Sequence, residues 1–301
     1  MQNPVYSTAE AESFFLRLYQ EQLDQWPVPF EQHFVRTEHG ITHVLSCGDE
    51  AAPPLILLHA ASTANIVWKP NIETLSAHFR VYAIDILGEV GLSVPYRKNK
   101  NTREQVDWLA EVMNKLGVER AAVAGGSAGG CLAINFAIDC PDRVGELVLL
   151  GPMGLPPSNL LTMLKILYYV LFPTEKNIQK LIRWSVGYNP AVLETYEPWF
   201  EGFFQGVDSS YVTRPSRIPN KRLASVACPT LLFLGLRDEV IGPPRRSEKR
   251  ARRMPGLERT ILLDTAHLIN YEKPAIVNEE MVKFLLKNQK ESAPSVKGAL
   301  S

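Results

Sequence analysis

Short apolar runs recur along this chain, and segments with a helical pattern separate them. The runs are PPLILLHA at 53–60, FRVYAID at 79–85, RAAVAGG at 120–126, ELVLLGP at 146–152, PTLLFLG at 229–235 and RTILLD at 259–264. A strand that is apolar on both faces is typical of a parallel sheet covered by helices on both sides. The alternation therefore predicts an α/β fold.

Other segments have patterns of their own. Residues 101–117 place apolar side chains on one helical face, with Asn101 or Thr102 able to cap the start and Gly117 after the end. Two extended stretches around EHG at 38–40 predict an antiparallel hairpin at the sheet edge. An amphipathic helix is expected around residues 8–24, and the tail after Lys287 is expected to be disordered.

The series of apolar, strand-like runs stops after Gly151 and resumes near residue 228. Segment 155–227 has helical patterns and many aromatic residues, which predicts a helical cap over the carboxyl edge of the sheet, where open α/β sheets bind ligands. The core would then comprise residues 1–154 and 228–301. Any single aromatic side chain is more simply explained by packing within the cap, but together they favour an apolar pocket. Candidates for this pocket are Trp184, Trp199 and Phe203.

Composition argues against several classes of function. The chain has 32 basic and 32 acidic residues, so no net charge favours nucleic acid or an anionic membrane as a partner. The segment LTMLKILYYVLF at 161–172 is too short for a membrane span and contains Lys165, although an interfacial role stays open. The start of the chain has no secretion signal. We expect a cytoplasmic protein, either a monomer or a homodimer.

The cysteines also favour a reducing compartment. Cys47, Cys131, Cys140 and Cys228 lie far apart and lack the spacing of a zinc or redox motif. We expect buried free thiols, with one disulfide as the minority alternative.

The segment GGSAG at 125–129 matches the pattern G-x-S-x-G. It follows the strand AAVA and opens a helical segment, which is the strand, turn and helix context in which this motif presents an exposed serine nucleophile. The glycine spacing fits neither a dinucleotide-binding fingerprint nor a phosphate-binding loop. Ser127 is therefore predicted to be the nucleophile of a hydrolase.

A serine nucleophile needs a base, and the base needs an orienting carboxylate. Asp238 follows the strand PTLLFLG, and His267 follows the strand RTILLD. Ser127, Asp238 and His267 occur in the chain order expected of a sheet hydrolase with this motif. Glu239 is a rival for the acidic role, and Asp238 is favoured because it lies three residues after Gly235 in a tight loop.

The tetrahedral oxyanion of acyl transfer is usually held by two backbone N–H groups. Ala128, the residue after the nucleophile, would supply one of them. The loop HAASTAN at 59–65 would supply the other, with Ala61 favoured over Ala60 and Ser62. His59 is expected to brace this loop by hydrogen bonds.

These motifs resemble the α/β-hydrolase superfamily over about residues 30–287, and more closely bacterial carboxylesterases of the naproxen-esterase type. The segments PPLILLHAAST, GGSAGG, GLRDEVIGPP and AHLINYEKPAIVNE stand where that family has its oxyanion loop, nucleophile elbow, acid loop and histidine loop. One departure is His59-Ala60, where His-Gly is usual.

The resemblance implies an α/β-hydrolase fold, with a mostly parallel sheet of about eight strands, helices on both faces and an inserted helical cap. It also implies an esterase that needs neither a cofactor nor a metal and acts on a small ester with an apolar acyl or aryl group. Ser127, Asp238 and His267 would be its triad, and Ala61 and Ala128 its oxyanion donors.

Two charged segments are predicted to be structural. Asp85 and Glu89 belong to the loop below the oxyanion strand by the same resemblance. The run RRSEKRARR at 245–253 can form a helix with Ala251 and Met254 inward and its charges in solvent.

Two alternative functions remain open. One is hydrolysis of a carbon–carbon bond in a vinylogous diketo acid, as in meta-cleavage-product hydrolases, for which Arg183 could hold the substrate carboxylate. The other is a non-catalytic ligand receptor on the same fold.

Overall fold

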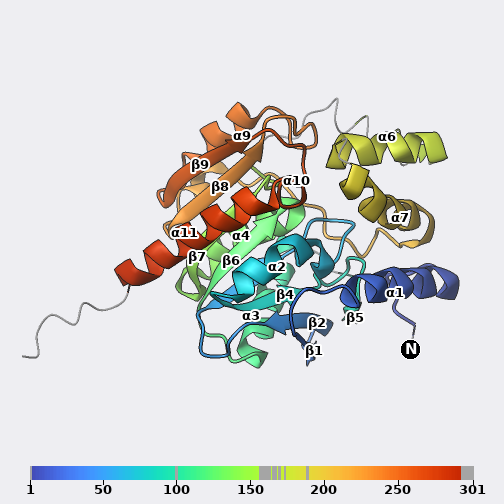
Figure 1. Ribbon diagram of the computed structural model, residues 1–301, viewed down its shortest axis with the longest axis horizontal. Coiled ribbons are helices and arrows are strands. Elements are labelled where there is room, and N and C mark those ends of the chain that lie inside the picture. Colours follow the sequence, from blue (N-terminus) through green and yellow to red (C-terminus); the bar gives the residue numbers. More distant parts are fainter. Residues whose placement is uncertain are drawn as a thin grey trace, which may run out of the picture.

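Within the part of the chain that the structure describes, nine strands form a single sheet, with strand order β1-β2-β4-β3-β6-β7-β8-β9 and β5 paired to β2 (Figure 1). The computed structural model describes residues 2–98, 101–155, 164, 168, 171–172, 174–187 and 190–292. The strands are β1 Glu31–Arg36, β2 Gly40–Cys47, β3 Pro54–Leu58, β4 Arg80–Ile84, β5 Val94–Pro95, β6 Ala121–Gly126, β7 Val144–Leu150, β8 Thr230–Gly235 and β9 Leu257–Leu263.

The pairing pattern confirms the predicted α/β fold. Strands β4, β3, β6, β7, β8 and β9 pair in parallel. Most residues of the first five are buried, whereas the outer strand β9 is largely half-buried or exposed. The predicted hairpin is present, because β1 pairs antiparallel with β2 around the turn at 37–39. The short strand β5 was not predicted, since two residues are too few to produce a periodic pattern.

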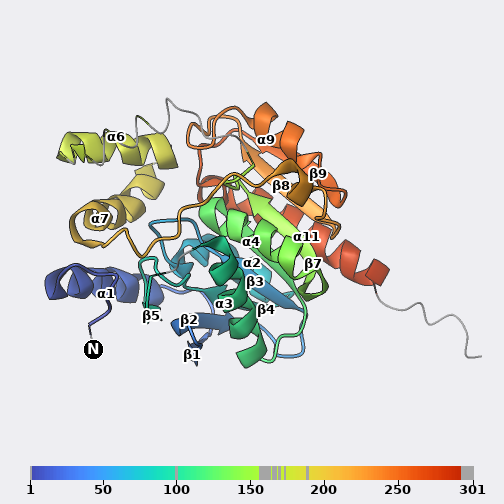
Figure 2. The ribbon, with the colours of Figure 1, turned by 180° about the vertical axis from the view of Figure 1, so that it is seen from behind.

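Helices cover both faces of the sheet. Figure 1 shows α2 and α11 in front of the strands, and Figure 2 shows α3 and α4 on the opposite face. Each face has its own apolar core, one including Leu55 and Met281 and the other including Ile56 and Trp108. The helices are α1 Ala9–Leu23, α2 Lys69–Ser76, α3 Thr102–Lys115, α4 Ser127–Asp139, α6 Glu175–Val186, α7 Pro190–Gly206, α8 Asn220–Leu223, α9 Pro244–Ala251, α10 Ile269–Glu272 and α11 Pro274–Ser292, with 3₁₀ turns at Asn65–Trp68 and Pro141–Arg143.

The segment between β7 and β8 contains α6 and α7 at one end of the molecule, with α7 lying between α1 and α6 (Figure 1). The rings of Phe15 in α1 and Trp199 in α7 are 5.7 Å apart. Before α1, the N–H of Ser7 donates to the carbonyl of Gly206, and Tyr6 bridges to Val207. The N-terminal helix therefore packs directly against α7.

The basic run at 245–253 forms α9 and the turn after it, with Ala251 and Met254 buried as predicted. The prediction that all its charges stay in solvent is wrong at Arg250, which is 8% exposed. Its guanidinium donates to the carbonyl oxygens of Gly154, Leu155 and Ile218. The buried Arg250 side chain therefore joins the segment just after β7 to the segment just before α8, and it supplies hydrogen-bond donors to the carbonyl groups of both.

The C-terminal prediction is also corrected. Helix α11 continues to Ser292, and Asn288 is buried with its side-chain amide donating to the carbonyl of Phe284. The expectation of disorder therefore fails for 288–292, and the rest of the tail lies outside the described residues. Most of 161–172 also lies outside them. None of the described helices combines the length and apolar character that crossing a bilayer requires.

Candidate active site

Ser127 lies at the sharp turn between β6 and α4. Its φ is +49°, a left-handed conformation that non-glycine residues rarely adopt. A Cβ atom on Gly125 would lie 2.5 Å from the carbonyl oxygen of Gly129, and one on Gly129 would lie 2.4 Å from that of Leu58. Gly126 is different, because the nearest such atom, the carbonyl oxygen of Leu150, is 4.0 Å away. The glycines at 125 and 129 thus provide clearance for a fixed turn.

His267 connects Ser127 to Asp238. Its Nε2 atom lies 2.7 Å from the Oγ atom of Ser127, and its Nδ1 atom lies 2.7 Å from the Oδ2 atom of Asp238. The other carboxylate oxygen of Asp238 accepts from the N–H groups of Val240 and Ile241. These bonds hold Asp238 against the imidazole, whereas the rival Glu239 is exposed.

Residues 59–64 form a braced loop after β3, which we call the oxyanion loop because it contains the candidate donors Ala60, Ala61 and Ser62. His59 is fully buried, its Nδ1 atom lies 2.8 Å from the carbonyl oxygen of Ala60, and its Nε2 atom accepts from the N–H of Ile86. Burial lowers the pKa of His59, so the ring is neutral and Nδ1 is the donor. The Ala60 carbonyl also accepts from the Thr63 hydroxyl. His59 thus acts as the predicted brace.

The candidate oxyanion donors differ in their surroundings. The N–H of Ser62 donates to Oε2 of Glu89 at 2.9 Å, so it is already engaged. The C=O and N–H of a trans peptide point in opposite directions. Because the Ala60 carbonyl faces His59 and Thr63, the N–H of Ala61 points away from them. Ala128 is in the first turn of α4, where an N–H has no acceptor within the helix.

A small cavity lies at Ser127. Its lining includes Ser127, His267, Ala60 and Asn270, and its apolar lining consists of Val67, Trp68, Leu150 and Leu268. Trp68 and Asn270 were not predicted as site residues. Trp68 lies in no recognisable motif, and Asn270 lies in the histidine loop segment, whose motif points to His267 alone. Asn270 follows His267 closely, and its side-chain amide donates to the carbonyl of Val67 and the Oδ1 of Asn71.

Two of the three predicted pocket aromatics, Trp199 and Phe203, are absent from the described lining of this cavity. Trp199 is 1% exposed and packs against Phe15 and Tyr19. Phe203 is half-buried and packs edge-on against Phe204. The side chain of Trp184 lies outside the described residues. Arg183, the candidate for binding a substrate carboxylate, is exposed on α6.

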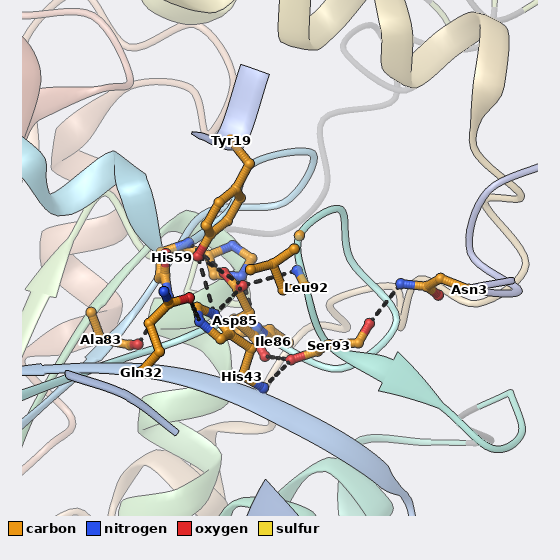
Figure 3. Close-up of polar contacts among 12 residues, drawn as sticks. Asn3, Tyr19, Gln32, His43, His59, Ala83, Asp85, Ile86, Leu92 and Ser93 are labelled. Atoms are coloured by element: carbon orange, nitrogen blue, oxygen red, sulfur yellow. Dashed lines mark hydrogen bonds and ion pairs between the residues drawn. The ribbon is translucent and has the colours of Figure 1, made fainter. Parts of the chain in front are cut away.

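A buried polar network surrounds Asp85 (Figure 3). Its Oδ2 atom lies 3.0 Å from the Tyr19 hydroxyl and 3.0 Å from Nδ1 of His43, and its Oδ1 atom accepts from the N–H of Asn65. Burial by itself would raise the pKa of Asp85, but the hydrogen bond and charge of His43 outweigh it and hold that pKa below its ordinary value. The network joins α1, β2 and the 3₁₀ turn Asn65–Trp68 that follows the oxyanion loop.

Within the described ranges, no group of three or more His, Cys, Asp or Glu side chains is arranged to hold a metal ion. The four cysteines are free thiols. The site therefore presents a hydroxyl, an imidazole, a carboxylate and backbone N–H groups as its chemical groups.

Known proteins resemble this chain both in sequence and in the arrangement of helices and strands. The family model described as alpha/beta hydrolase fold matches residues 53–192. The crystal structure of naproxen esterase (carboxylesterase NP) from Bacillus subtilis has a TM-score of 0.83 at 27% identity, covering 93% of this chain and 99% of that one. This chain therefore has the α/β-hydrolase fold.

Two curated relatives match nearly the whole length of this chain, and both are carboxylesterases. The uncharacterized carboxylesterase nap of Bacillus subtilis is 29% identical over 90% of this chain and 91% of its own length. Carboxylesterase YbfK of the same species is 27% identical over 93% of this chain and 96% of its own length. The sequence resemblance to carboxylesterases of the naproxen-esterase type is thus confirmed.

Proposed function

We propose that this α/β hydrolase is a carboxylesterase that cleaves small carboxylic esters through an acyl-enzyme intermediate. The observation that carries the proposal is the chain of two 2.7 Å hydrogen bonds from Asp238 through His267 to Ser127. This geometry is what an activated serine requires. The similarity to two carboxylesterases over nearly the full length supports the same reaction.

In this mechanism, His267 takes the proton of the Ser127 hydroxyl as Oγ attacks the ester carbonyl carbon. Asp238 stabilises the imidazolium, and the N–H groups of Ala61 and Ala128 hold the oxyanion. The tetrahedral intermediate collapses, and His267 gives its proton to the leaving alcohol. Water then attacks the acyl-enzyme with His267 again as base, which releases the acid and restores Ser127.

The substrate proposed is an ester with an apolar acyl or aryl group. Val67, Trp68, Leu150 and Leu268 surround the reacting serine with apolar side chains, which favours such a group over a charged one. We also propose that residues 155–227 act as a cap on a core formed by 1–154 and 228–301. The pairing of β7 with β8 supports this division, because the insertion leaves and rejoins the sheet at neighbouring strands.

The test is a panel of p-nitrophenyl esters from acetyl to long acyl chains, assayed with the wild type and Ser127→Ala. We expect wild-type turnover with an optimum at one acyl length, and loss of at least about 10³-fold in kcat for Ser127→Ala. Circular dichroism of both proteins checks that the variant is folded. Near-wild-type ester turnover by a folded Ser127→Ala protein would refute the proposal.

Carbon–carbon bond hydrolysis is the second candidate. A 2-hydroxy-6-oxononadienedioate/2-hydroxy-6-oxononatrienedioate hydrolase of Burkholderia vietnamiensis is 27% identical over 79% of this chain and 88% of its own length. The described cavity at Ser127 includes no Lys or Arg to hold a substrate carboxylate, which favours the ester. Turnover of a vinylogous diketo acid with a kcat/KM above that of the best ester would reverse this order.

A further inference from the structure

Glu89 is a buried carboxylic acid that the triad does not use. It is 5% exposed and lies in the loop after β4, and its Oε2 atom accepts the N–H of Ser62 at 2.9 Å. It also lines a second small cavity together with Ala128, the proposed oxyanion donor on α4. Glu89 therefore contacts the oxyanion loop and shares a cavity lining with Ala128, the second proposed oxyanion donor.

The backbone around Ala61 explains why this contact matters. The peptide that carries the Ala61 N–H is held by the bonds from His59 and Thr63 to the Ala60 carbonyl. The next peptide is held by the bond from the Ser62 N–H to Glu89. Ser62 has a φ of +60°, in the left-handed region that an L-residue occupies only when its surroundings hold it there.

We propose that Glu89 is a positioning residue for the oxyanion loop, whose carboxyl oxygen fixes the 61–62 peptide and so keeps the Ala61 N–H directed at the oxyanion. This inference rests on the proposed esterase function. Without that acceptor, the 61–62 peptide is free to rotate and Ser62 to leave its left-handed conformation. The Ala61 N–H would then be held on one side only, by the bonds to the Ala60 carbonyl, and would be less well preorganised. Preorganisation is the property that makes an oxyanion hole effective.

The charge on Glu89 has a second consequence. A carboxylate beside the oxyanion site opposes the negative charge of the tetrahedral intermediate, whereas the neutral acid does not. Burial raises the pKa of Glu89 to about 7, and the bond from Ser62 opposes this rise only in part. The acid therefore keeps its proton to near-neutral pH and still accepts the Ser62 N–H through its carbonyl oxygen.

No cationic side chain compensates Glu89 among the described residues that line its cavity. Cys131 on α4 is the titratable neighbour there, and burial raises its thiol pKa to about 12, so it is neutral. Thr102 and Gln105 on α3 and Thr213 from the insertion are uncharged. In the oxyanion loop His59 is neutral, and in the loop of Glu89 itself Asp85 is paired with His43.

The experiment compares Glu89→Gln, which keeps an acceptor oxygen, with Glu89→Leu, which removes it. At about pH 6 we expect Glu89→Gln to stay within about threefold of the wild-type kcat, and Glu89→Leu to lose about 10- to 100-fold in kcat with KM nearly unchanged. Glu146→Gln is the matched control, because Glu146 is also a buried acid with a raised pKa but lies near the start of β7. It should leave kcat unchanged.

The pH profile supplies a readout that does not depend on the folding of Glu89→Leu. Wild-type kcat/KM should fall about three- to tenfold from pH 7 to pH 9 as Glu89 ionises, and this fall should be absent in Glu89→Gln. Three results would overturn the inference. They are a fall in kcat/KM for Glu89→Gln between pH 7 and pH 9 as large as that of the wild type, a wild-type kcat for Glu89→Leu, or an equal loss of kcat in both variants. Ester turnover that survives Ser127→Ala would instead refute the proposed function.

Discussion

The Nε2 atom of His267 lies 2.7 Å from the Oγ atom of Ser127, although 140 residues separate them in the chain. Ser127 follows β6 and His267 follows β9, and both strands run in the same direction in one sheet. Their carboxyl ends therefore meet at one edge. The contact depends on this shared edge and on Asp238, which fixes the orientation of the imidazole.

Asp238 rather than Glu239 is expected to act with His267. Asp238→Asn should lower kcat by about 10³- to 10⁴-fold, because an amide cannot stabilise the imidazolium and favours the wrong ring tautomer. Glu239→Gln, the matched control, should change kcat less than about threefold, because Glu239 is exposed. Steady-state ester kinetics measure both. The opposite ranking would assign the acidic role to Glu239.

Gly129 and Gly126 are expected to differ in their tolerance of a side chain. Gly129→Ala places a Cβ atom 2.4 Å from the carbonyl oxygens of Leu58 and His59, whereas Gly126→Ala meets its nearest atom at 4.0 Å. We expect the first to lower the free energy of unfolding by about 1–3 kcal/mol or more, and the second to change it far less. Urea unfolding gives the comparison. Equal stabilities would show that the elbow relaxes around the added methyl group.

Asp85 is expected to stabilise the fold in a pH-dependent way. Its folded pKa lies below the ordinary value of 3.8, so the folded state holds fewer protons than the unfolded chain between those two pKa values. Its contribution is complete above the unfolded pKa and is lost as the pH falls through the folded one. Asp85→Asn should therefore lower the free energy of unfolding by about 3–5 kcal/mol at pH 7, and by less near pH 3.

Urea unfolding at both pH values tests this expectation for Asp85→Asn. Asp107→Asn is the control, because Asp107 pairs with Arg103 on the exposed face of α3 and should contribute less than about 1 kcal/mol. If Asp85→Asn lowers the free energy of unfolding equally at both pH values, the stabilisation does not depend on ionisation of the Asp85 carboxylate, and the prediction is wrong.

Trp199 is expected to stabilise the contact between α1 and α7 rather than to select the substrate. It is almost fully buried against Phe15 and Tyr19, so Trp199→Ala should cost about 3–5 kcal/mol of unfolding free energy. Replacing the half-buried Phe203 by alanine should lower the free energy of unfolding by less. The acyl-length optimum should stay the same in Trp199→Ala. A shifted optimum with unchanged stability would return Trp199 to the substrate pocket.

The order of the elements was predictable because it depends on short windows of sequence. Apolar runs produced strands close to their predicted positions, and Asn101 caps α3 by accepting the N–H of Glu104. The turn at Ser127 was also predictable, because the pattern G-x-S-x-G lies within five consecutive residues. In the structure, close backbone packing at positions 125 and 129 demands glycine. The basic run at 245–253 was predicted only in part, because a helical pattern does not reveal a distant carbonyl group that needs a donor.

What the sequence determined by itself was the succession of strands, the serine turn and the chain order of Ser127, Asp238 and His267. Only the tertiary structure decided which side chains meet. It engaged the Ser62 N–H with Glu89, buried Arg250 against the carbonyls of Gly154 and Leu155, and packed Trp199 against α1 instead of the cavity at Ser127. The physical reason is that backbone preference and periodicity act over a few neighbouring residues. A polar group's partner, by contrast, is set by elements that pack together from distant parts of the chain.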